Sequence, residues 1–382
     1  MICLSLFNES LHFKSVLYSL SSKGDEIVNM MVNDIEKIIT IDKSNMLDGL
    51  ARFPEQIKES LAIAEATERF NFIKVDNVII AGMGASAISG DILASLFRDK
   101  LDVPLIVNRD YDLPKWVNKD TLVICISYSG NTIETLSSFK IASQKKCKII
   151  CISTGGKLQD PAEKRGIPFV KVPAGIQPRA ATAYLLFPPM IFLKKIGLLK
   201  TAIETDIDET IKVTQDFVTM NKKTAPEENN LSNHLAKKIF NTIPQIYGWG
   251  IYTPIAIRWR HQFNENSKII ARTDLVPDCN HNDIVGWSAN PEISKLFSCI
   301  LFRDKDEESI EMTTRLNFMH DLFHNTAGNV IEVSPKGKSQ LAKMMYLMCL
   351  GDFTSCYLAV LRGIDPSPVD IITELKKRLD DK

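Results

Sequence analysis

The chain has 382 residues, 45% of them hydrophobic, and its 46 basic and 46 acidic side chains give a formal net charge of zero. This length favours about two domains, each with enough apolar residues to bury a core. The balanced charge argues against a nucleic-acid or anionic-membrane partner, because such partners select strongly basic surfaces, and we expect neither. A small anionic ligand would need only a local basic site.

The N-terminal region is mildly apolar, but it lacks the pattern of a membrane span or a secretory signal. Asn8 and Glu9 interrupt its apolar run, and it has no basic start and no clear cleavage site. Amphipathic patterns over 26–41 and, more clearly, over 44–66 predict helices. We therefore treat residues 1–44 as an extension, in part helical, ahead of the first domain.

The cysteine pattern is typical of reduced, buried thiols in a cytoplasmic protein. Most of the eight cysteines lie inside apolar runs, and none belongs to a CxxC pair. The most closely spaced candidate ligands are Cys147 with Cys151 and His320 with His324, and neither pair has a third ligand nearby. We expect no metal site at either pair.

Five short apolar runs predict a parallel sheet in the first domain. They span residues 78–82, 104–108, 121–126, 147–152 and 167–172. The segments between them are long enough for crossover helices, and near-continuous apolar strands belong in a sheet that is covered on both faces. Ligands of such sheets bind at the carboxyl ends of the strands.

A glycine-rich turn follows the first of these strands and leads into a helix that starts near Ser86. Gly82 and Gly84 are similar to a dinucleotide-binding fingerprint, but the spacing is GxGxSxxxG rather than GxGxxG. Asp102 and Asp110 are also poor matches to the expected ribose-binding acid. The turn therefore argues against a nicotinamide cofactor, and we predict no cofactor.

A second turn, SYSGNTIET at 127–135, follows the strand 121–126 and also opens a helix. Unpaired backbone N–H groups and the helix dipole favour a phosphate dianion at such a place. Asn131 is the predicted cap, with Glu134 completing a capping box. Hydroxyl donors are available from Ser127, Ser129 and Thr132. Spacing alone leaves an ordinary strand-to-helix turn equally open, although two such turns could converge on one ligand.

Arg179 follows the last predicted strand of this sheet, in the sequence Gln177-Pro178-Arg179-Ala180. At the carboxyl edge it could face the same crevice and stabilise the charge of an enediolate. By spacing alone, a solvated surface arginine is the simpler interpretation.

A charged stretch over 201–231 predicts a surface helix and a linker, with Ala225-Pro226 at a boundary. A second unit of the same kind begins near Ser232. Its predicted strands are 244–249, 268–271, 298–303 and 329–333, and its predicted helices include 306–324 and 337–361. Because this half has no phosphate-type turn, we expect the site to be built mainly on the first domain.

Six motifs in this order resemble the bifunctional phosphoglucose/phosphomannose isomerases, which are two-domain proteins of the sugar isomerase (SIS) superfamily. The motifs are GMGASAI at 82–88, SYSGNTIET at 127–135, QPRAATAYLL at 177–186, FNENSK at 263–268, NHNDIVGW at 280–287 and LGDFTSCYLA at 350–359. The resemblance runs from about Asn45 to the C-terminus. It implies two tandem SIS-type three-layer αβα domains, each around a mainly parallel sheet, over 45–224 and over 225–382 with a C-terminal helix.

The resemblance implies that the protein interconverts glucose 6-phosphate and mannose 6-phosphate with fructose 6-phosphate through a cis-enediol, without a metal. It assigns the phosphate to Ser86, Ser127, Ser129 and Thr132, and the sugar to Gly84 and Ala85. Ala85 is a departure, because the family often has glycine there. Cys279 is another, where an apolar residue is more usual.

The resemblance also assigns the catalytic groups. Glu265 would move the proton between C1 and C2, although a glutamate in a polar turn is usually just solvated. Arg179 would stabilise the enediolate. His281 would help to open the ring from the neighbouring subunit, which implies a homodimer with a shared active site. Lys376 would complete the site, with adjacent Lys377 as the alternative register.

Two other functions stay open at this point. One is a non-catalytic sugar-phosphate sensor, against which the joint presence of Arg179, Glu265 and His281 argues. The other is a metal-dependent mannose-phosphate isomerase, which the sparse His and Cys patterns argue against. Residue types do not rank glucose over mannose substrates.

Overall fold

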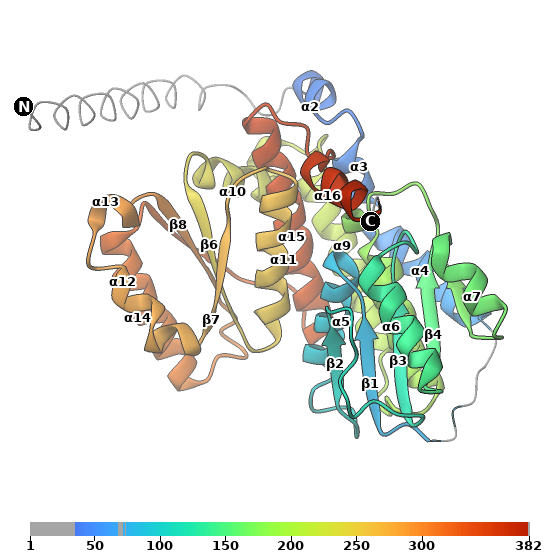
Figure 1. Ribbon diagram of the computed structural model, residues 1–382. Coiled ribbons are helices and arrows are strands. Elements are labelled where there is room, and N and C mark those ends of the chain that lie inside the picture. The colour runs from blue at the N-terminus through green and yellow to red at the C-terminus, as the bar shows by residue number, and fades with distance from the viewer. Residues whose placement is uncertain (1–34, 68–71, 73, 381–382) are drawn as a thin grey trace, which may run out of the picture.

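In the computed structural model, which describes residues 35–67, 72 and 74–380, the chain forms two parallel sheets flanked by helices (Figure 1). This confirms the predicted fold class, two successive α/β units around parallel sheets. The helices between and around the sheets join the two halves into one apolar core.

The first sheet has five parallel strands in the order β2-β1-β3-β4-β5. They are β1 Asn77–Ala81, β2 Leu105–Asn108, β3 Thr121–Ile126, β4 Lys148–Ser153 and β5 Phe169–Lys171. All five predicted strands are confirmed to within a few residues. Every residue of β3 is buried, because side chains on both faces of this central strand pack against helices.

Helices cover both faces of this sheet. Alternate residues such as Ile80 and Ile124 pack in a cluster that includes α4 Phe53–Ala66, α5 Gly84–Leu96 and α8 Thr182–Lys195. The opposite face packs under α6 Ile133–Gln144, α7 Gln159–Glu163 and the short helix η1 Gly156–Leu158. The period-two alternation of a strand sends neighbouring side chains to these two cores.

The predicted helix over 44–66 is wrong in one respect, because it is two helices. α3 Met46–Ala51 ends at Arg52, and α4 restarts at Phe53 with Pro54 in its first turn. Proline lacks a backbone N–H and is best tolerated in the first turn of a helix, so it favours a break there. Of the helix predicted over 26–41, α2 Ile35–Ile41 is present, and the rest lies outside the described residues.

The second sheet has four parallel strands in the order β7-β6-β8-β9. They are β6 Ile243–Trp249, β7 Arg272–Val276, β8 Phe297–Phe302 and β9 Asn329–Val333. The strand predicted over 268–271 is wrong, because pairing with β6 begins only at Arg272. Lys268 has a φ of 51°, a left-handed conformation that an extended strand cannot contain.

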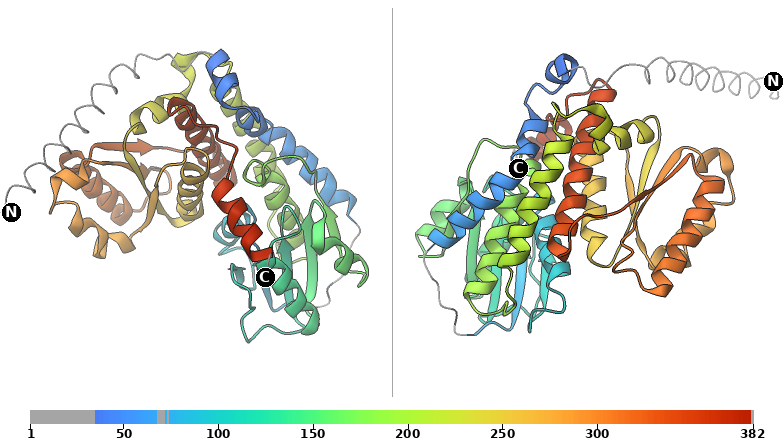
Figure 2. Two further views of the ribbon diagram at one scale, coloured as in Figure 1. Left: turned by 45° about the horizontal axis from the view of Figure 1, so that its top comes forward. Right: turned by 180° about the vertical axis from the view of Figure 1, so that it is seen from behind.

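The remaining helices pack around the second sheet and between the halves (Figure 2). They are α9 Glu204–Asn221, α10 Leu231–Ile239, α11 Thr253–Glu265, α12 Asp283–Gly286, α13 Pro291–Ser294, α14 Ile310–Thr326, α15 Gln340–Leu361 and α16 Asp370–Asp380, with short helices η2 Pro178–Ala180, η3 Glu227–Asn229, η4 Gly250–Tyr252 and η5 Asp278–His281. The predicted surface helix is α9, but its Ile207, Phe217 and Val218 are buried, and it packs along α15.

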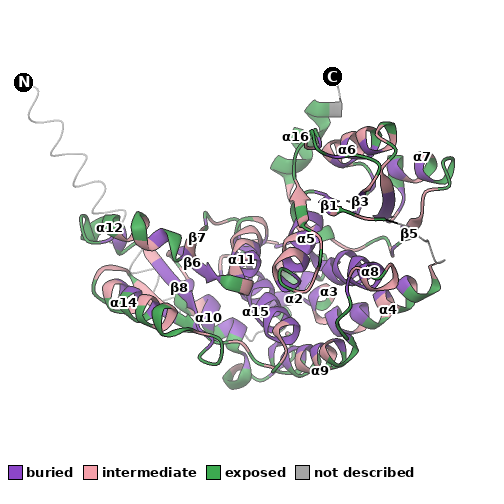
Figure 3. Ribbon diagram, turned by 90° about the horizontal axis from the view of Figure 1, so that it is seen from below, coloured by how far each residue is buried: buried purple, intermediate pink, exposed green. Residues whose placement is uncertain are grey.

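α15 is the central helix of the molecule, and Figure 3 shows it among buried segments. All of its residues from Leu341 to Leu361 are buried. It is long and apolar enough to cross a bilayer, but its apolar stretch is entirely covered by the fold, as in the core helix of a soluble protein. The predicted domain boundary, between 224 and 225, falls between α9 and α10 and remains a prediction.

Candidate active site

The two glycine-rich turns meet at the carboxyl edge of the first sheet. β1 and β3 are neighbours, so the chain leaves both strands at the same edge. A Cβ atom at Gly82 would lie 2.9 Å from the Ile126 carbonyl oxygen and 2.9 Å from the Ser86 Cβ. Only glycine permits this approach, and it brings Ser86 beside the end of β3.

The second turn brings two of its three hydroxyl groups together. The Ser127 Oγ and Thr132 Oγ1 atoms are 2.9 Å apart, and the Ser129 Oγ accepts the Asn131 N–H at 3.2 Å. Ser86 and Ser127 are buried, whereas Ser129 is exposed. Together with the free N–H groups at the start of α6, these hydroxyls form a cradle suited to an anion.

The loop after β4 holds this turn in place. Gly130 has a φ of 70°, and a Cβ there would lie 1.8 Å from the Gly155 carbonyl oxygen. The Leu158 N–H donates to the Gly130 carbonyl at 3.0 Å. Asn131 does not cap α6, which corrects the predicted capping box: its Oδ1 accepts the Lys157 N–H at 2.9 Å, and Thr132 occupies the cap position instead.

Gly84 and Ala85 begin α5 beside the phosphate-type turn. Gly84 has a φ of 52° and is exposed, and Ala85 is half-buried. Their backbone N–H groups belong to the first turn of the helix, where they have no intrahelical partners.

Arg179 is buried and held by backbone and side-chain acceptors, so it is not the solvated arginine that spacing alone favours. Its Nε donates to the Asn266 Oδ1 at 2.6 Å. Its Nη2 donates to the carbonyl oxygens of Pro366 and Ser367, at 2.7 and 2.8 Å. Burial lowers the pKa of Arg179, and the nearby Glu265 carboxylate counteracts this effect.

Glu265 lies opposite Arg179, although the two are far apart in the sequence. It is the last residue of α11, and its Oε2 is 3.7 Å from the Arg179 Nη1. Its side chain is 30% exposed, so a ligand can still reach the carboxylate. The structure therefore brings together the predicted base and the predicted enediolate-stabilising cation.

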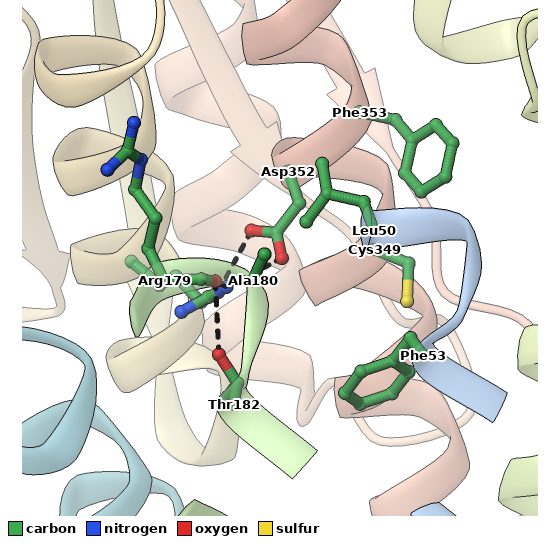
Figure 4. A pocket seen from close by; sticks show the side chains of 9 residues that line it. Leu50, Phe53, Arg179, Ala180, Thr182, Cys349, Asp352 and Phe353 are labelled. Atoms are coloured by element: carbon green, nitrogen blue, oxygen red, sulfur yellow. Dashed lines mark hydrogen bonds and ion pairs between the residues drawn. The ribbon is translucent and has the colours of Figure 1, made fainter. Parts of the chain in front are cut away.

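A buried ion pair between Arg258 and Asp352 contacts the backbone of Arg179. Asp352 on α15 accepts from the Arg258 Nε at 2.9 Å and Nη2 at 2.6 Å, and the same Nη2 donates to the Arg179 carbonyl at 2.7 Å. Burial raises the pKa of Asp352, and Arg258 counteracts it. Figure 4 shows Asp352 directed toward the segment of Arg179 and Ala180, beside a cavity of about 10 Å³. That cavity has room for no more than a water molecule.

Lys268 also belongs to this group, and the sequence reasoning missed it. Its Nζ donates to the carbonyl oxygens of Glu265 at 2.6 Å and Pro366 at 3.0 Å. Burial and then the Arg179 charge lower its pKa. The available signal was its place in the motif FNENSK, three residues after Glu265, but a lysine just past a helix is more often solvated.

His281 lies at the other edge of the second sheet from Glu265. α11 runs back from the carboxyl end of β6, so Glu265 reaches the amino edge, from which the chain enters β7. His281 is exposed and ends η5, which follows the carboxyl end of β7. The length of β7, about 17 Å at about 3.3 Å per residue in a parallel strand, separates the two edges. One chain therefore does not bring His281 to Glu265.

Lys376 and Lys377 lie on α16 and are exposed. Figures 1 and 3 place this helix beside α6, on the side of the phosphate-type turn. Among the described residues, no hydrogen bond or ion pair joins either lysine to Arg179 or Glu265. The register between the two lysines stays a prediction.

Within residues 35–67, 72 and 74–380, no group of three or more His, Cys, Asp or Glu side chains is arranged to hold a metal ion. The seven cysteines in the described part of the chain are free, and six of them are buried. The rings of His320 and His324 stack on α14.

Two family models match the two halves of the chain. Residues 71–161 match the SIS domain, and residues 228–379 match the bacterial phospho-glucose isomerase C-terminal SIS domain. These matches support the predicted resemblance and identify both sheets as parts of SIS-type units.

Curated relatives match most of the chain. A bifunctional phosphoglucose/phosphomannose isomerase from Caldicellulosiruptor bescii is 40% identical over 336 residues, covering 87% of this chain and 98% of the relative. One of the same name from Aquifex aeolicus is 34% identical, covering 79% and 90%. Among solved structures, a hypothetical protein from Thermus thermophilus has a TM-score of 0.69 at 15% identity, covering 97% and 96% of the two chains, which supports the fold alone.

Proposed function

Because this chain belongs to the bifunctional phosphoglucose/phosphomannose isomerase family, we propose that it interconverts glucose 6-phosphate and mannose 6-phosphate with fructose 6-phosphate. The main support in the structure is the 3.7 Å approach of the Glu265 carboxylate to the buried Arg179, together with two phosphate-type turns at the carboxyl edge of the first sheet. Isomerisation of a sugar phosphate needs three groups: donors that bind the phosphate, a base that moves the proton and a cation that stabilises the charged intermediate.

In the proposed reaction, Ser86, Ser127, Ser129 and Thr132 hold the phosphate, and Gly84 and Ala85 contact the sugar. Glu265 removes the proton from C2 of the opened aldose and returns it to C1. Removal of the proton gives the enediolate, which is the deprotonated form of the cis-enediol and carries negative charge on oxygen. Arg179 stabilises that charge, and its other N–H groups remain bonded to Asn266, Pro366 and Ser367.

Ring opening requires proton transfer at the ring oxygen and at the O1 hydroxyl. We assign this step to His281 of the partner subunit, together with Lys376 or Lys377 on α16. The position of His281 at the edge away from Glu265 supports a role in a neighbouring site and therefore a homodimer. The exposed lysines would reach the substrate by movement of α16.

The proposed mechanism uses side chains alone and needs no metal, and we place the protein in the cytoplasm. The buried free thiols among the described cysteines support a reducing compartment.

The test is a coupled assay for fructose 6-phosphate formation from glucose 6-phosphate and, separately, from mannose 6-phosphate, with EDTA present. Turnover of both sugar phosphates supports the proposal, and turnover of only one would restrict the substrate range to that sugar phosphate. Loss of turnover in EDTA that is restored by a divalent cation would favour a metal-dependent isomerase. Binding of sugar phosphates without turnover under any condition would favour a sensor.

A further inference from the structure

A cavity of about 130 Å³ lies between α9, the start of α10 and α15, apart from the group around Glu265. Figure 2 shows α9 beside α15, the helices that form its walls. The buried Phe217 and Tyr346 form its floor, and the exposed Met220 and Leu231 lie at its mouth. Since a protein cavity of roughly 150 Å³ can hold benzene, this one has room for a branched chain or a single ring.

Tyr346 is the residue that points to a ligand in this cavity. It is only 5% exposed, and its ring packs edge-on against Phe217 with the ring centroids 5.4 Å apart. In the part of the chain that the structure describes, its hydroxyl group has no hydrogen-bond partner. Burial raises the pKa of Tyr346 to about 12, so the hydroxyl keeps its proton at pH 7. Buried polar groups are normally paired, and this donor is free for a ligand.

Two side chains of opposite charge also line the cavity. The Lys336 Nζ lies 5.8 Å from the centre of the Tyr346 ring, and Asp216 extends from α9. Both residues are exposed. Over residues 35–67, 72 and 74–380, neither forms an ion pair with another side chain. A simple anion would be repelled by Asp216 and a simple cation by Lys336, whereas a ligand with both charges is attracted to both.

We propose that this cavity binds a zwitterionic α-amino acid with an apolar side chain of about the size of leucine. The ligand carboxylate accepts hydrogen bonds from the Tyr346 hydroxyl and the Lys336 ammonium. The ligand ammonium faces Asp216. The apolar side chain covers Phe217 and displaces water from the cavity.

The cavity is separate from the proposed active site. Tyr346 is six residues before Asp352 on α15, about 9 Å along the helix. None of the residues that line the cavity is among those to which we assign the sugar phosphate. An amino acid bound here therefore leaves the phosphate-type turns and Glu265 free, and its binding does not depend on isomerase activity.

The test is isothermal titration calorimetry of the full chain with L-leucine and with two fragments of it. The fragments are 4-methylpentanoate, which lacks the ammonium, and 3-methylbutylamine, which lacks the carboxylate. We expect saturable binding of one leucine per chain, and affinity for each fragment that is lower by about tenfold or more, because each leaves one charge of the cavity unpaired. Saturating glucitol 6-phosphate, a sugar phosphate without a reactive carbonyl, should not change leucine binding.

Substitutions assign the binding to this cavity. Tyr346→Phe removes only the hydroxyl and keeps the ring on Phe217, so the fold should be as stable as before, while the affinity for leucine falls by about tenfold. Asp216→Asn should weaken leucine binding by roughly threefold and leave 4-methylpentanoate binding undiminished. Asp208→Asn, at another exposed acid on α9, is the matched control and should change neither.

Four results would overturn the proposal. The first is no saturable binding of leucine, and the second is binding of 4-methylpentanoate as tight as that of leucine. The third is wild-type affinity for leucine in a folded Tyr346→Phe chain. The fourth is displacement of leucine by glucitol 6-phosphate, which would place the amino acid at the phosphate-type turns instead.

Discussion

At the scale of single residues, the Glu265 carboxylate is the group on which the proposed chemistry depends most. Glu265→Gln keeps the size and polarity of the side chain but cannot accept the C2 proton. We expect kcat to fall by about 10²–10⁴ while KM for fructose 6-phosphate changes little, because the phosphate-binding turns are untouched. Steady-state kinetics measures both. The control is Glu228→Gln, at an exposed position. If Glu265→Gln kept wild-type turnover, Glu265 would have no part in the mechanism.

Lys268 gives a second prediction at this scale. Its ammonium joins the end of α11 to the carbonyl of Pro366, which also holds Arg179, so we assign it a positioning role. Lys268→Asn removes the charge and suits the left-handed backbone, because asparagine tolerates positive φ. We expect kcat to fall about tenfold or more with KM little changed, since a hydrogen bond from a charged donor contributes ~1.5–3 kcal/mol.

The matched variant is Lys268→Arg, which keeps a cationic donor. It should recover part of kcat although arginine is strained in the left-handed backbone as lysine is. If Lys268→Asn retained full kcat, or if both variants lost activity only in proportion to a loss of folded protein, Lys268 would have no positioning role.

How much of the site could be predicted from the sequence differs from residue to residue. The phosphate-type turns follow from local rules, because strand, glycine and hydroxyl residues are adjacent in the chain. Arg179 and Glu265 are not adjacent, and only the fold of both halves brings them within 3.7 Å, so spacing alone favoured solvated side chains. Family resemblance supplied that pairing. Lys268 could not be predicted from the sequence, because its proposed role comes from contacts with backbone carbonyls.

At the scale of helices and strands, the sequence predicted the buried parts best. β3 is a continuous apolar run and was predicted at its observed bounds, since both of its faces are covered. β7 is an edge strand with polar residues. The apolar pair Ile269 and Ile270 favoured a strand over 268–271, which begins four residues before the observed one. The turn at Lys268 and the break at Arg52 depend on backbone conformations that hydrophobic periodicity does not record.

The link between α11 and α15 is the element-scale feature that we expect to matter most for stability. Asp352→Ala would leave Arg258 buried without its partner, and breaking such a pair costs about 3–5 kcal/mol of unfolding free energy. Urea denaturation measures this loss. The control is Asp102→Ala, which breaks an ion pair with Lys200 at the surface. The Lys200 side chain is 74% exposed and the Asp102 side chain 70% exposed, so this loss should cost at most about 1 kcal/mol of unfolding free energy.

Equal destabilisation by the two variants would show that the buried pair has no special structural role. Arg258→Met combined with Asp352→Leu should be less destabilising than Asp352→Ala, because no unpaired charge remains. Loss of activity in this double variant with retained stability would assign the pair to positioning of Arg179, whose carbonyl Arg258 contacts.

At the scale of the whole molecule, the two sheets share a core through α9, α15, α5 and α11, which no local pattern predicts. The carboxyl edge of the first sheet thereby meets the amino edge of the second, where α11 ends at Glu265. The same arrangement directs the η5 loop with His281 away from its own Glu265. In the proposed mechanism, His281 would therefore act in the site of a second chain.

Mixing two inactive variants tests whether His281 acts in this way. In a homodimer with shared sites, Glu265→Gln and His281→Gln subunits form heterodimers in which one site has both defects and the other has neither. Random exchange makes half of the dimers hybrid, so the mixture should regain about a quarter of wild-type activity. The measurement is isomerase activity after partial denaturation and refolding of the mixture, with each variant refolded alone as the control. Activity no higher than the sum of the separate variants would show that His281 acts within its own chain or not at all.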